Sequence, residues 1–219
     1  MRLGFKLCMH MQIPDFTHEA AALGSGAAYV VGVDEVGRGP LAGPVTAAAV
    51  RLDPRNIPPG LNDSKKLSAM QRIRLSAEIH ASAEVCIAHA SVCEIEELNI
   101  LRASHLAMCR AVTGLEGTDF VLIDGKMLPR DLTVPALALV GGDARCLSIS
   151  AASIVAKTCR DAIMVGLAQQ HPGYGWETNA GYGTRAHLEA LRYLGVTPHH
   201  RRTFAPVHHM LYQEKYLTD

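Results

Sequence analysis

Carboxylates follow apolar stretches at three places in this chain of 219 residues. They are Asp34 and Glu35 after residues 29–33, Asp124 after residues 119–123, and Asp143 after residues 134–142. The stretches are rich in valine, leucine and isoleucine, which favours buried β-strands. A carboxylate at the end of a buried strand is costly to desolvate unless a cation compensates its charge. Because hard oxygen ligands suit Mg²⁺ and Mn²⁺, the pattern indicates a divalent-metal site.

A single strand that ends in an acid is commonplace, and Asp34-Glu35 alone fits a solvated turn equally well. Three such strands in one domain favour a shared acidic pocket, because ligands of open α/β sheets collect at strand ends. The alternative is three unrelated solvated turns. Four carboxylates can hold two divalent ions roughly 3.5–4 Å apart, a spacing that supports phosphodiester hydrolysis. Neighbouring strand residues face opposite ways, so Asp34 and Glu35 can share a metal only if the strand bends or Glu35 already lies in the turn.

A glycine-rich turn, Gly37-Arg38-Gly39, follows the first two acids. Glycine has no Cβ, so its backbone can approach a ligand closely and present N–H and C=O groups to it. Such a loop could read a ribose 2′-hydroxyl, the group that distinguishes RNA from DNA, while Arg38 pairs with a phosphate. Alternatively, the glycines serve only the hairpin turn that leads into a second strand at residues 44–52.

Aromatic and basic residues supply further candidate contacts with a nucleic acid. Tyr174, Trp176 and Tyr182 lie in one glycine-rich loop, where exposed rings could stack on a sugar or a base. Rings in such a loop more often pack it against the core. The candidate phosphate contacts are Lys65, Lys66, Arg185, Arg201 and Arg202, of which the run His199-His200-Arg201-Arg202 is the strongest. The eleven histidines show no metal-ligand spacing and are interpreted as surface or core residues.

The elements that must position these residues are predicted from apolar periodicity and from capping residues. Ser68 and Gln71 form a capping-box pattern, and Thr184 is the expected cap of a later helix. Beyond the strands above, we expect a strand at residues 85–92 and helices at residues 68–83, 94–112, 148–170 and 184–195. We also expect an extended basic segment at residues 197–206 and a last short helix at residues 207–217.

Composition sets the broad class of the protein. Hydrophobic residues make up 48% of the chain, enough for a full core. Lysine plus arginine and aspartate plus glutamate both total 21, so any nucleic acid must be bound through local basic patches. The six cysteines form no C-x-x-C pair, which is typical of reduced thiols.

No membrane or export segment is predicted. No apolar run reaches the roughly 18 residues of a membrane span, and the N-terminus lacks the apolar region of a signal peptide. We therefore expect a cytoplasmic protein. Residues 1–28 are predicted to be a flexible N-terminal extension, because residues 20–28 are small, as in linkers.

Taken together and in order, these motifs resemble bacterial ribonuclease HII. The matching segments are residues 33–44, 62–67 (Asn-Asp-Ser-Lys-Lys-Leu), 122–125, 142–143, 151–157, 181–184 with His187, and 200–206 (His-Arg-Arg-Thr-Phe-Ala-Pro). The similarity covers roughly residues 29–207 in the order and at the spacing of the family, which makes it far more specific than any single motif.

The resemblance implies an α/β protein of the ribonuclease H-like fold, a mixed β-sheet flanked by helices with a small helical C-terminal part. Residues 29–207 would form the catalytic domain and residues 208–219 a tail or short helix. The implied activity is metal-dependent hydrolysis of the RNA strand of RNA/DNA hybrids. Incision 5′ of single ribonucleotides embedded in duplex DNA is also implied, and with it ribonucleotide removal and primer clearance. The implied cofactors are two divalent ions, Mn²⁺ or Mg²⁺, and the implied state is a monomer that binds no membrane.

The resemblance also assigns roles to particular residues. Asp34, Glu35, Asp124 and Asp143 would be the catalytic acids that bind metal. Gly37, Arg38 and Gly39 would read the 2′-hydroxyl at the RNA–DNA junction. Tyr182, or alternatively Tyr174, would stack on the following deoxyribose, and the substrate backbone would meet Lys65, Lys66, Arg201 and Arg202. Two departures from the family are Ala180 in place of a lysine, which removes one phosphate contact, and Thr203 in place of a serine, which keeps the hydroxyl.

Two other functions remain to be weighed against the endonuclease. A non-catalytic binder of hybrids would use the acids only for structure, but all four carboxylates are present. A junction-resolving or DNA-strand nuclease would keep the fold, but DNA offers no 2′-hydroxyl for the Gly-Arg-Gly loop to read. Formal neutrality also predicts few phosphate contacts and a moderate salt dependence of binding.

Overall fold

A five-stranded mixed sheet forms the centre of the protein, whose computed structural model describes residues 13–212. The strands are β1 (Val30–Val36), β2 (Val45–Leu52), β3 (Ala83–Ala90), β4 (Phe120–Asp124) and β5 (Ala136–Leu139). They lie in the order β3-β2-β1-β4-β5. β1 and β2 form the predicted antiparallel hairpin and β3 pairs antiparallel with β2, whereas β4 pairs parallel with β1 and β5 pairs parallel with β4. The mixed sheet confirms the predicted fold class.

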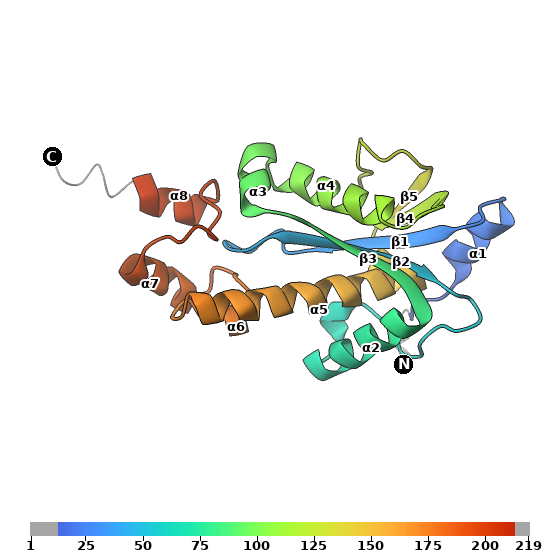
Figure 1. The fold of residues 1–219 in the computed structure, drawn as a ribbon, viewed down its shortest axis with the longest axis horizontal. Helices are drawn as coiled ribbons and strands as arrows, with labels where there is room; N and C mark the ends of the chain where they lie inside the picture. The colour runs from blue at the N-terminus through green and yellow to red at the C-terminus, as the bar shows by residue number, and fades with distance from the viewer. Residues whose placement is uncertain (1–12, 213–219) are drawn as a thin grey trace, which may run out of the picture.

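Helices cover both faces of the sheet (Figure 1). One face carries α3 (Val92–Leu98) and α4 (Ile100–Thr113), and the other carries α2 (Ala69–Ser82) and the long α5 (Leu147–Gln170). The remaining helical segments are α1 (Thr17–Gly24), η1 (Ser64–Lys66), η2 (Gly142–Ala144), α6 (Trp176–Asn179), α7 (Arg185–Leu194) and α8 (Ala205–Tyr212). The last three form a small helical part at the C-terminal end of α5. No helix among residues 13–212 is long and apolar enough to cross a membrane.

Strand β1 lies at the middle of the core and alternates between its two faces. Val31 and Val33 pack with residues of α4 in one buried cluster. Gly32 points the other way, and a Cβ added there would overlap the backbone of Ser148 and Ile149 at the start of α5. Glycine at this position therefore lets strand and helix approach more closely than any side chain would allow.

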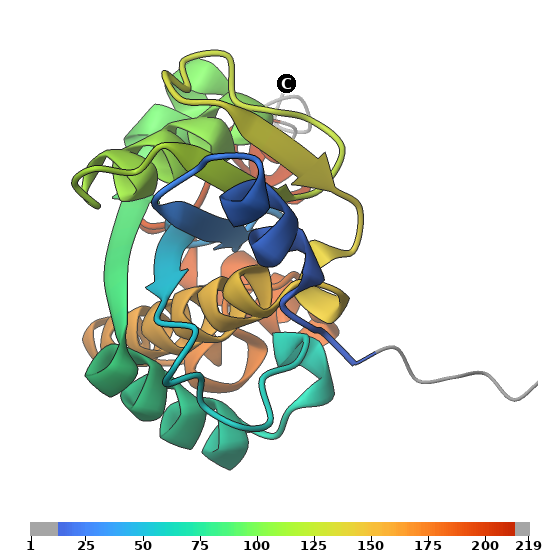
Figure 2. The same ribbon diagram turned by 90° about the vertical axis from the view of Figure 1, so that its right-hand side faces the viewer.

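The N-terminal region differs from the flexible extension that we expected. Residues 17–24 form α1, which packs beside the first turn of α5 (Figure 2). Glu19 is buried there, and its Oε1 accepts a hydrogen bond of 2.7 Å from the Ser148 backbone N–H. A carboxylate at the N-terminus of a helix is stabilised by the helix dipole. The alanines of this segment, interpreted above as linker residues, are also strong helix formers; residues 1–12 lie outside the described part.

A single helix predicted at residues 94–112 is divided in the structure. Asn99 has φ of +68°, a left-handed conformation that asparagine tolerates better than most residues, and it separates α3 from α4. Its side chain then caps α4 by accepting from the N–H groups of Leu101 and Arg102. The predicted capping box of Ser68 and the Thr184 cap are both present. The last predicted helix begins at Ala205, and residues 213–219 lie outside the description.

Candidate active site

The structure brings the four strand-end acids together. β4 ends at Asp124 while its parallel neighbour β1 continues to Val36, so a step opens beside Asp34 and Glu35. Asp143 reaches the same step from η2, and the Gly142 backbone N–H donates to Asp124 Oδ1 at 2.7 Å. We call Asp34, Glu35, Asp124 and Asp143 the acid cluster.

Asp34 and Glu35 lie on opposite sides of the sheet, because β1 stays regular through both of them. Glu35 still pairs with Ala47 of β2, so neither the bend nor the early turn considered above occurs. Asp34 is buried on the α5 side with Gly32, whereas Glu35 lines a cleft of 330 Å³ on the α4 side. Asp124 lines that cleft as well, and it therefore connects the two sides of the step.

Mutual repulsion and burial dominate the electrostatics of the acid cluster. Burial raises the pKa of Asp34 well above its usual range, and the charges of Glu35, Asp124 and Asp143 raise it further. Burial also raises the pKa values of Glu35 and Asp143, against the opposing influence of one basic neighbour each. Arg38 Nη1 lies 3.2 Å from Glu35 Oε1, and Lys65 Nζ lies 3.4 Å from Asp143 Oδ2. Two side-chain cations thus compensate four carboxylates only in part.

A divalent cation fits the chemistry of this donor set. The donors are hard carboxylate oxygens, and they carry more negative charge than Arg38 and Lys65 supply. Within residues 13–212, however, no three aspartate, glutamate, histidine or cysteine side chains converge on one point as they stand. Cation binding therefore requires rotation of carboxylates, in particular release of Glu35 from Arg38 or of Asp143 from Lys65.

Replacing Asp34 by asparagine should stabilise the metal-free protein. Since the pKa of Asp34 is raised by folding, the folded state binds a proton more tightly than the unfolded state, and stability falls as pH rises through this range. At pH 7.5 we expect Asp34→Asn to raise Tm by about 2–6 °C, an advantage that disappears near pH 4. Thermal unfolding of metal-free protein at both pH values measures it. The exposed Asp53, whose pKa is lowered by its hydrogen bonds to Arg55, is the matched control, and an equal gain in Asp53→Asn would contradict the explanation.

Two of the predicted substrate residues contact the acid cluster, Arg38 at Glu35 and Lys65 at Asp143. We call residues 37–44 the glycine-arginine loop; Gly37 has φ of +94°, which favours glycine. Arg38 is half-exposed and Lys65 strongly exposed, so both can reach a ligand. Lys66 and Arg202 are exposed too. Burial opposes the charge on Lys65, but Asp143, Asp63 and Asp34 together raise its pKa.

Of the two candidate tyrosines, Tyr182 has an exposed ring beside the glycine-arginine loop, whereas Tyr174 is buried. Tyr182 is 48% exposed, and its ring packs over Gly39, where an added Cβ would lie 3.2 Å from Cε1. Tyr174 is 4% exposed and stacks on the buried Trp176, while its hydroxyl donates to the Gly195 carbonyl. The geometry therefore favours Tyr182 over Tyr174 as a surface for stacking.

The prediction that Arg201 contacts substrate phosphate is wrong. Arg201 is fully buried, and its guanidinium donates only to backbone carbonyls of the glycine-arginine loop. The run His199-His200-Arg201-Arg202 looked like a solvated basic face, but two of its members point inward. Arg160 of α5, which the sequence analysis did not select, is buried beneath the same loop. An arginine within a mostly apolar helix was the sequence signal that could have indicated this buried role.

Two buried histidines support the backbone of Tyr182. His200 Nδ1 accepts from the Thr197 N–H at 3.0 Å, while His187 Nε2 accepts from the Trp176 indole N–H at 3.0 Å and lies 3.1 Å from His200 Nε2. His187 in turn donates from Nδ1 to the Tyr182 carbonyl at 2.9 Å. Burial lowers the pKa of both rings, that of His200 to about 3, so both are neutral. Both histidines are buried and hydrogen-bonded to other groups of the protein.

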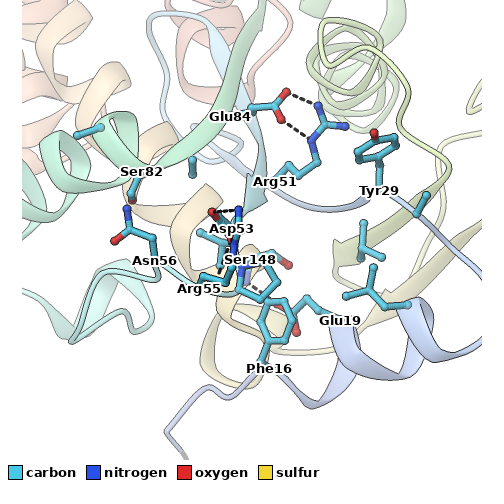
Figure 3. Close-up of a pocket in the computed structure, with 17 residues that line it drawn as sticks. Phe16, Glu19, Tyr29, Arg51, Asp53, Arg55, Asn56, Ser82, Glu84 and Ser148 are labelled. Carbon is cyan, nitrogen blue, oxygen red and sulfur yellow. Dashed lines mark hydrogen bonds and ion pairs between the residues drawn. The ribbon is translucent and has the colours of Figure 1, made fainter.

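A second and larger cavity lies at the end of the sheet where β1 begins (Figure 3). It measures 570 Å³ and contains none of the acid cluster. Arg51 lines this cavity, where it pairs with Glu84, donates to the Glu116 carbonyl and lies over the Tyr29 ring. Arg51 is thus engaged with its neighbours, and the acid cluster lies at the opposite end of β1.

Comparison with known proteins adds independent findings. The family model described as ribonuclease HII matches residues 31–210. Ribonuclease HII of Cereibacter sphaeroides is 69% identical over 207 residues, which cover 94% of this chain and 98% of that protein. Ribonuclease HII of Paracoccus denitrificans is 66% identical over 209 residues, 95% of this chain and 100% of that protein. The crystal structure of ribonuclease H2 from Pyrococcus horikoshii superposes with a TM-score of 0.71 at 25% identity, over 87% of this chain and 100% of that one.

Proposed function

This chain belongs to the ribonuclease HII family, and we propose that it is a metal-dependent endonuclease that incises duplex DNA on the 5′ side of single embedded ribonucleotides. Membership in the family makes the chain an endoribonuclease, a hydrolase that cleaves the RNA strand of RNA/DNA hybrids. The observation that carries the finer proposal is the acid cluster, with the glycine-arginine loop and Tyr182 directly beside it.

The acid cluster would hold two divalent cations, Mg²⁺ or Mn²⁺. When bound, such cations lower the pKa of an attacking water and neutralise charge on the leaving oxygen. Asp34 would reach them from the α5 side and Glu35 from the α4 side, with Asp124 between them. Lys65 and Arg38, released from Asp143 and Glu35, would be free to meet the phosphates on either side of the scissile bond.

Recognition of the ribonucleotide would fall to the glycine-arginine loop. Its glycines bring backbone close to the ligand, and a 2′-hydroxyl both donates and accepts hydrogen bonds. Tyr182, held over Gly39, would stack on the sugar of the next nucleotide. Lys66 and Arg202 are exposed and would add contacts with the backbone of the substrate.

The direct test is cleavage of a DNA duplex that carries one ribonucleotide, with Mg²⁺, with Mn²⁺ and with EDTA. We expect a nick 5′ of the ribonucleotide with either metal and none with EDTA. If only continuous hybrids are cut, the acid cluster keeps its role but the proposed roles of the loop and Tyr182 fail. Binding of hybrid without any cleavage would instead favour the non-catalytic binder.

Substitutions of Tyr182 should separate its ring from its hydroxyl. Stacking needs only the ring, so Tyr182→Phe should keep nearly full cleavage of the single-ribonucleotide duplex, whereas Tyr182→Ala should lose about 10- to 100-fold. Steady-state kinetics on that duplex measures both. Tyr193, which is 87% exposed on α7, is the control, and Tyr193→Ala should cut like the parent protein. Equal losses in Tyr182→Phe and Tyr182→Ala would transfer the role to the hydroxyl.

A further inference from the structure

Two buried arginines lie beneath the glycine-arginine loop and bind its carbonyl groups. Arg201 donates to Gly37 at 2.6 Å, to Arg38 at 3.0 Å, to Pro40 at 2.8 Å, and to Gly43 at 2.9 and 3.0 Å. Arg160 donates to Ala42 and Pro44, both at 3.0 Å. Six carbonyls of residues 37–44 are thus turned inward toward two guanidinium groups, and the Leu41 carbonyl accepts from the Arg201 backbone N–H at 2.8 Å.

One of the two arginines, Arg160, also connects the loop to the segment that precedes the tyrosine. Arg160 Nη1 donates to the Ala180 carbonyl at 2.9 Å, two residues before Tyr182. The Leu41 N–H donates to the Gly181 carbonyl at 2.8 Å, which ties the segments directly. A Cβ at Gly37 would overlap the Arg160 side chain, so loop and guanidinium are in close contact. Arg160 therefore bonds both the glycine-arginine loop and the segment that leads into Tyr182, and it holds the two at a fixed distance.

The charge of this pair is not neutralised by acids. Within residues 13–212, neither Arg160 nor Arg201 lies within ion-pair distance of a carboxylate. Burial lowers the pKa of Arg160 to about 10 and that of Arg201 to about 9, so both remain charged at neutral pH. A buried cation is tolerated only when its hydrogen bonds are satisfied, and the five N–H groups of a guanidinium satisfy more carbonyls than the three of an ammonium. Two buried positive charges thus lie beneath the loop, and hydrogen bonds to its carbonyl groups stabilise them.

We propose that Arg160 and Arg201 are positioning residues for ribonucleotide recognition, which fix the glycine-arginine loop and Tyr182 in one geometry and place positive charge behind the surface that meets the nucleic acid. This proposal rests on the proposed function. The Leu41 and Gly43 N–H groups donate to the Gly181 and His199 carbonyls, so the backbone N–H groups of residues 37–39 would be the ones to meet the oxygens of a phosphate or a ribose. A lysine at either position keeps the charge but cannot hold the same set of carbonyls, so the loop would become misplaced.

The test compares Arg201→Lys and Arg160→Lys with Arg51→Lys. The Arg51 side chain is largely buried, bonds a carboxylate and a carbonyl, and lies at the far end of β2, which makes it a control for lost stability. We expect both loop variants to lose about 100-fold in kcat on the single-ribonucleotide duplex with a smaller change in KM. We expect Mn²⁺ to raise the Tm of these variants and of the parent protein by the same amount. Arg51→Lys should lose stability but keep its kcat.

Arg201→Ala offers a second readout, because millimolar guanidinium chloride can occupy the space left by the side chain and should restore part of kcat. If Arg201→Lys and Arg160→Lys keep the kcat of Arg51→Lys, and guanidinium restores nothing, the proposal is overturned. The parent protein is measured alongside on both the single-ribonucleotide duplex and a continuous hybrid. Should it fail to cut the duplex, the proposed function fails, and the same comparison on the hybrid decides the role of the two arginines.

Discussion

Asp124→Asn is expected to eliminate cleavage while leaving the fold and the binding of hybrid intact. Asparagine keeps the oxygen that accepts the 2.7 Å hydrogen bond from the Gly142 N–H, so the turn before α5 is preserved. The variant lacks the negative charge of Asp124, which lies between Asp34 on the α5 side and Glu35 on the α4 side. Loss of one preorganised electrostatic group typically costs about 10²- to 10³-fold in kcat, and we expect at least this loss here. Single-turnover cleavage and an electrophoretic binding assay measure the two properties separately.

The matched control for this variant is Asp131→Asn. Asp131 is exposed on the same connection between β4 and β5, outside the acid cluster. It should cut and bind like the parent protein, since surface substitutions usually change stability by no more than about 0.5 kcal/mol. Full activity in Asp124→Asn would remove Asp124 from the site. Loss of binding together with cleavage would show that the carboxylate holds the substrate in place.

The largest expected effect on stability comes from Gly32→Ala. The new Cβ would overlap the backbone of Ser148 and Ile149, and backbone atoms cannot rotate out of the way as a side chain can. β1 and α5 would have to separate across the centre of the core, and we expect a cost of at least about 3 kcal/mol. Urea unfolding monitored by circular dichroism measures the change in the free energy of unfolding.

Gly166→Ala, near the C-terminal end of α5, provides the comparison. A Cβ there meets nothing within 4 Å, and alanine is favoured over glycine in a helix by up to about 1 kcal/mol. This variant should be unchanged or slightly more stable. If Gly32→Ala were as stable as Gly166→Ala, the close approach of strand and helix would not be a requirement of the fold.

That the four acids come together could be predicted from the sequence because apolar strands followed by acids have a local signal. Apolar residues followed by Asp124 indicate both the strand and its end, whereas β1 continues past Asp34 to Val36. The face that each acid occupies was harder to predict, since it depends on the register of β1 with β2. Because β1 pairs regularly through Glu35, the Glu35 side chain lies on the α4 side. The sequence analysis had considered only a bend in the strand or an early turn at Glu35.

Arg201 shows why other roles could not be predicted. Its neighbours His199 and Arg202 suggest an exposed basic run, and its partners are backbone carbonyls more than 150 residues away. A carbonyl group is present at every residue, so no sequence pattern marks it as a partner. The same reasoning applies to Arg160, which lies among apolar residues of α5. The break at Asn99 was missed because a left-handed residue is compatible with the helical periodicity on both sides of it.

The bonds between Arg201 and the glycine-arginine loop also constrain the order of events during synthesis. Gly37 precedes Arg201 by 164 residues, and at roughly 5–20 residues per second the ribosome needs about 8–30 s to make the chain between them. The β1–β2 hairpin can form early in this interval, but the loop that joins its strands cannot be fixed by Arg201 until that residue has been synthesised. A nascent chain should therefore carry an assembled sheet before this loop is fixed, and if the loop has the proposed role, recognition of the ribonucleotide would be among the last properties that the chain acquires.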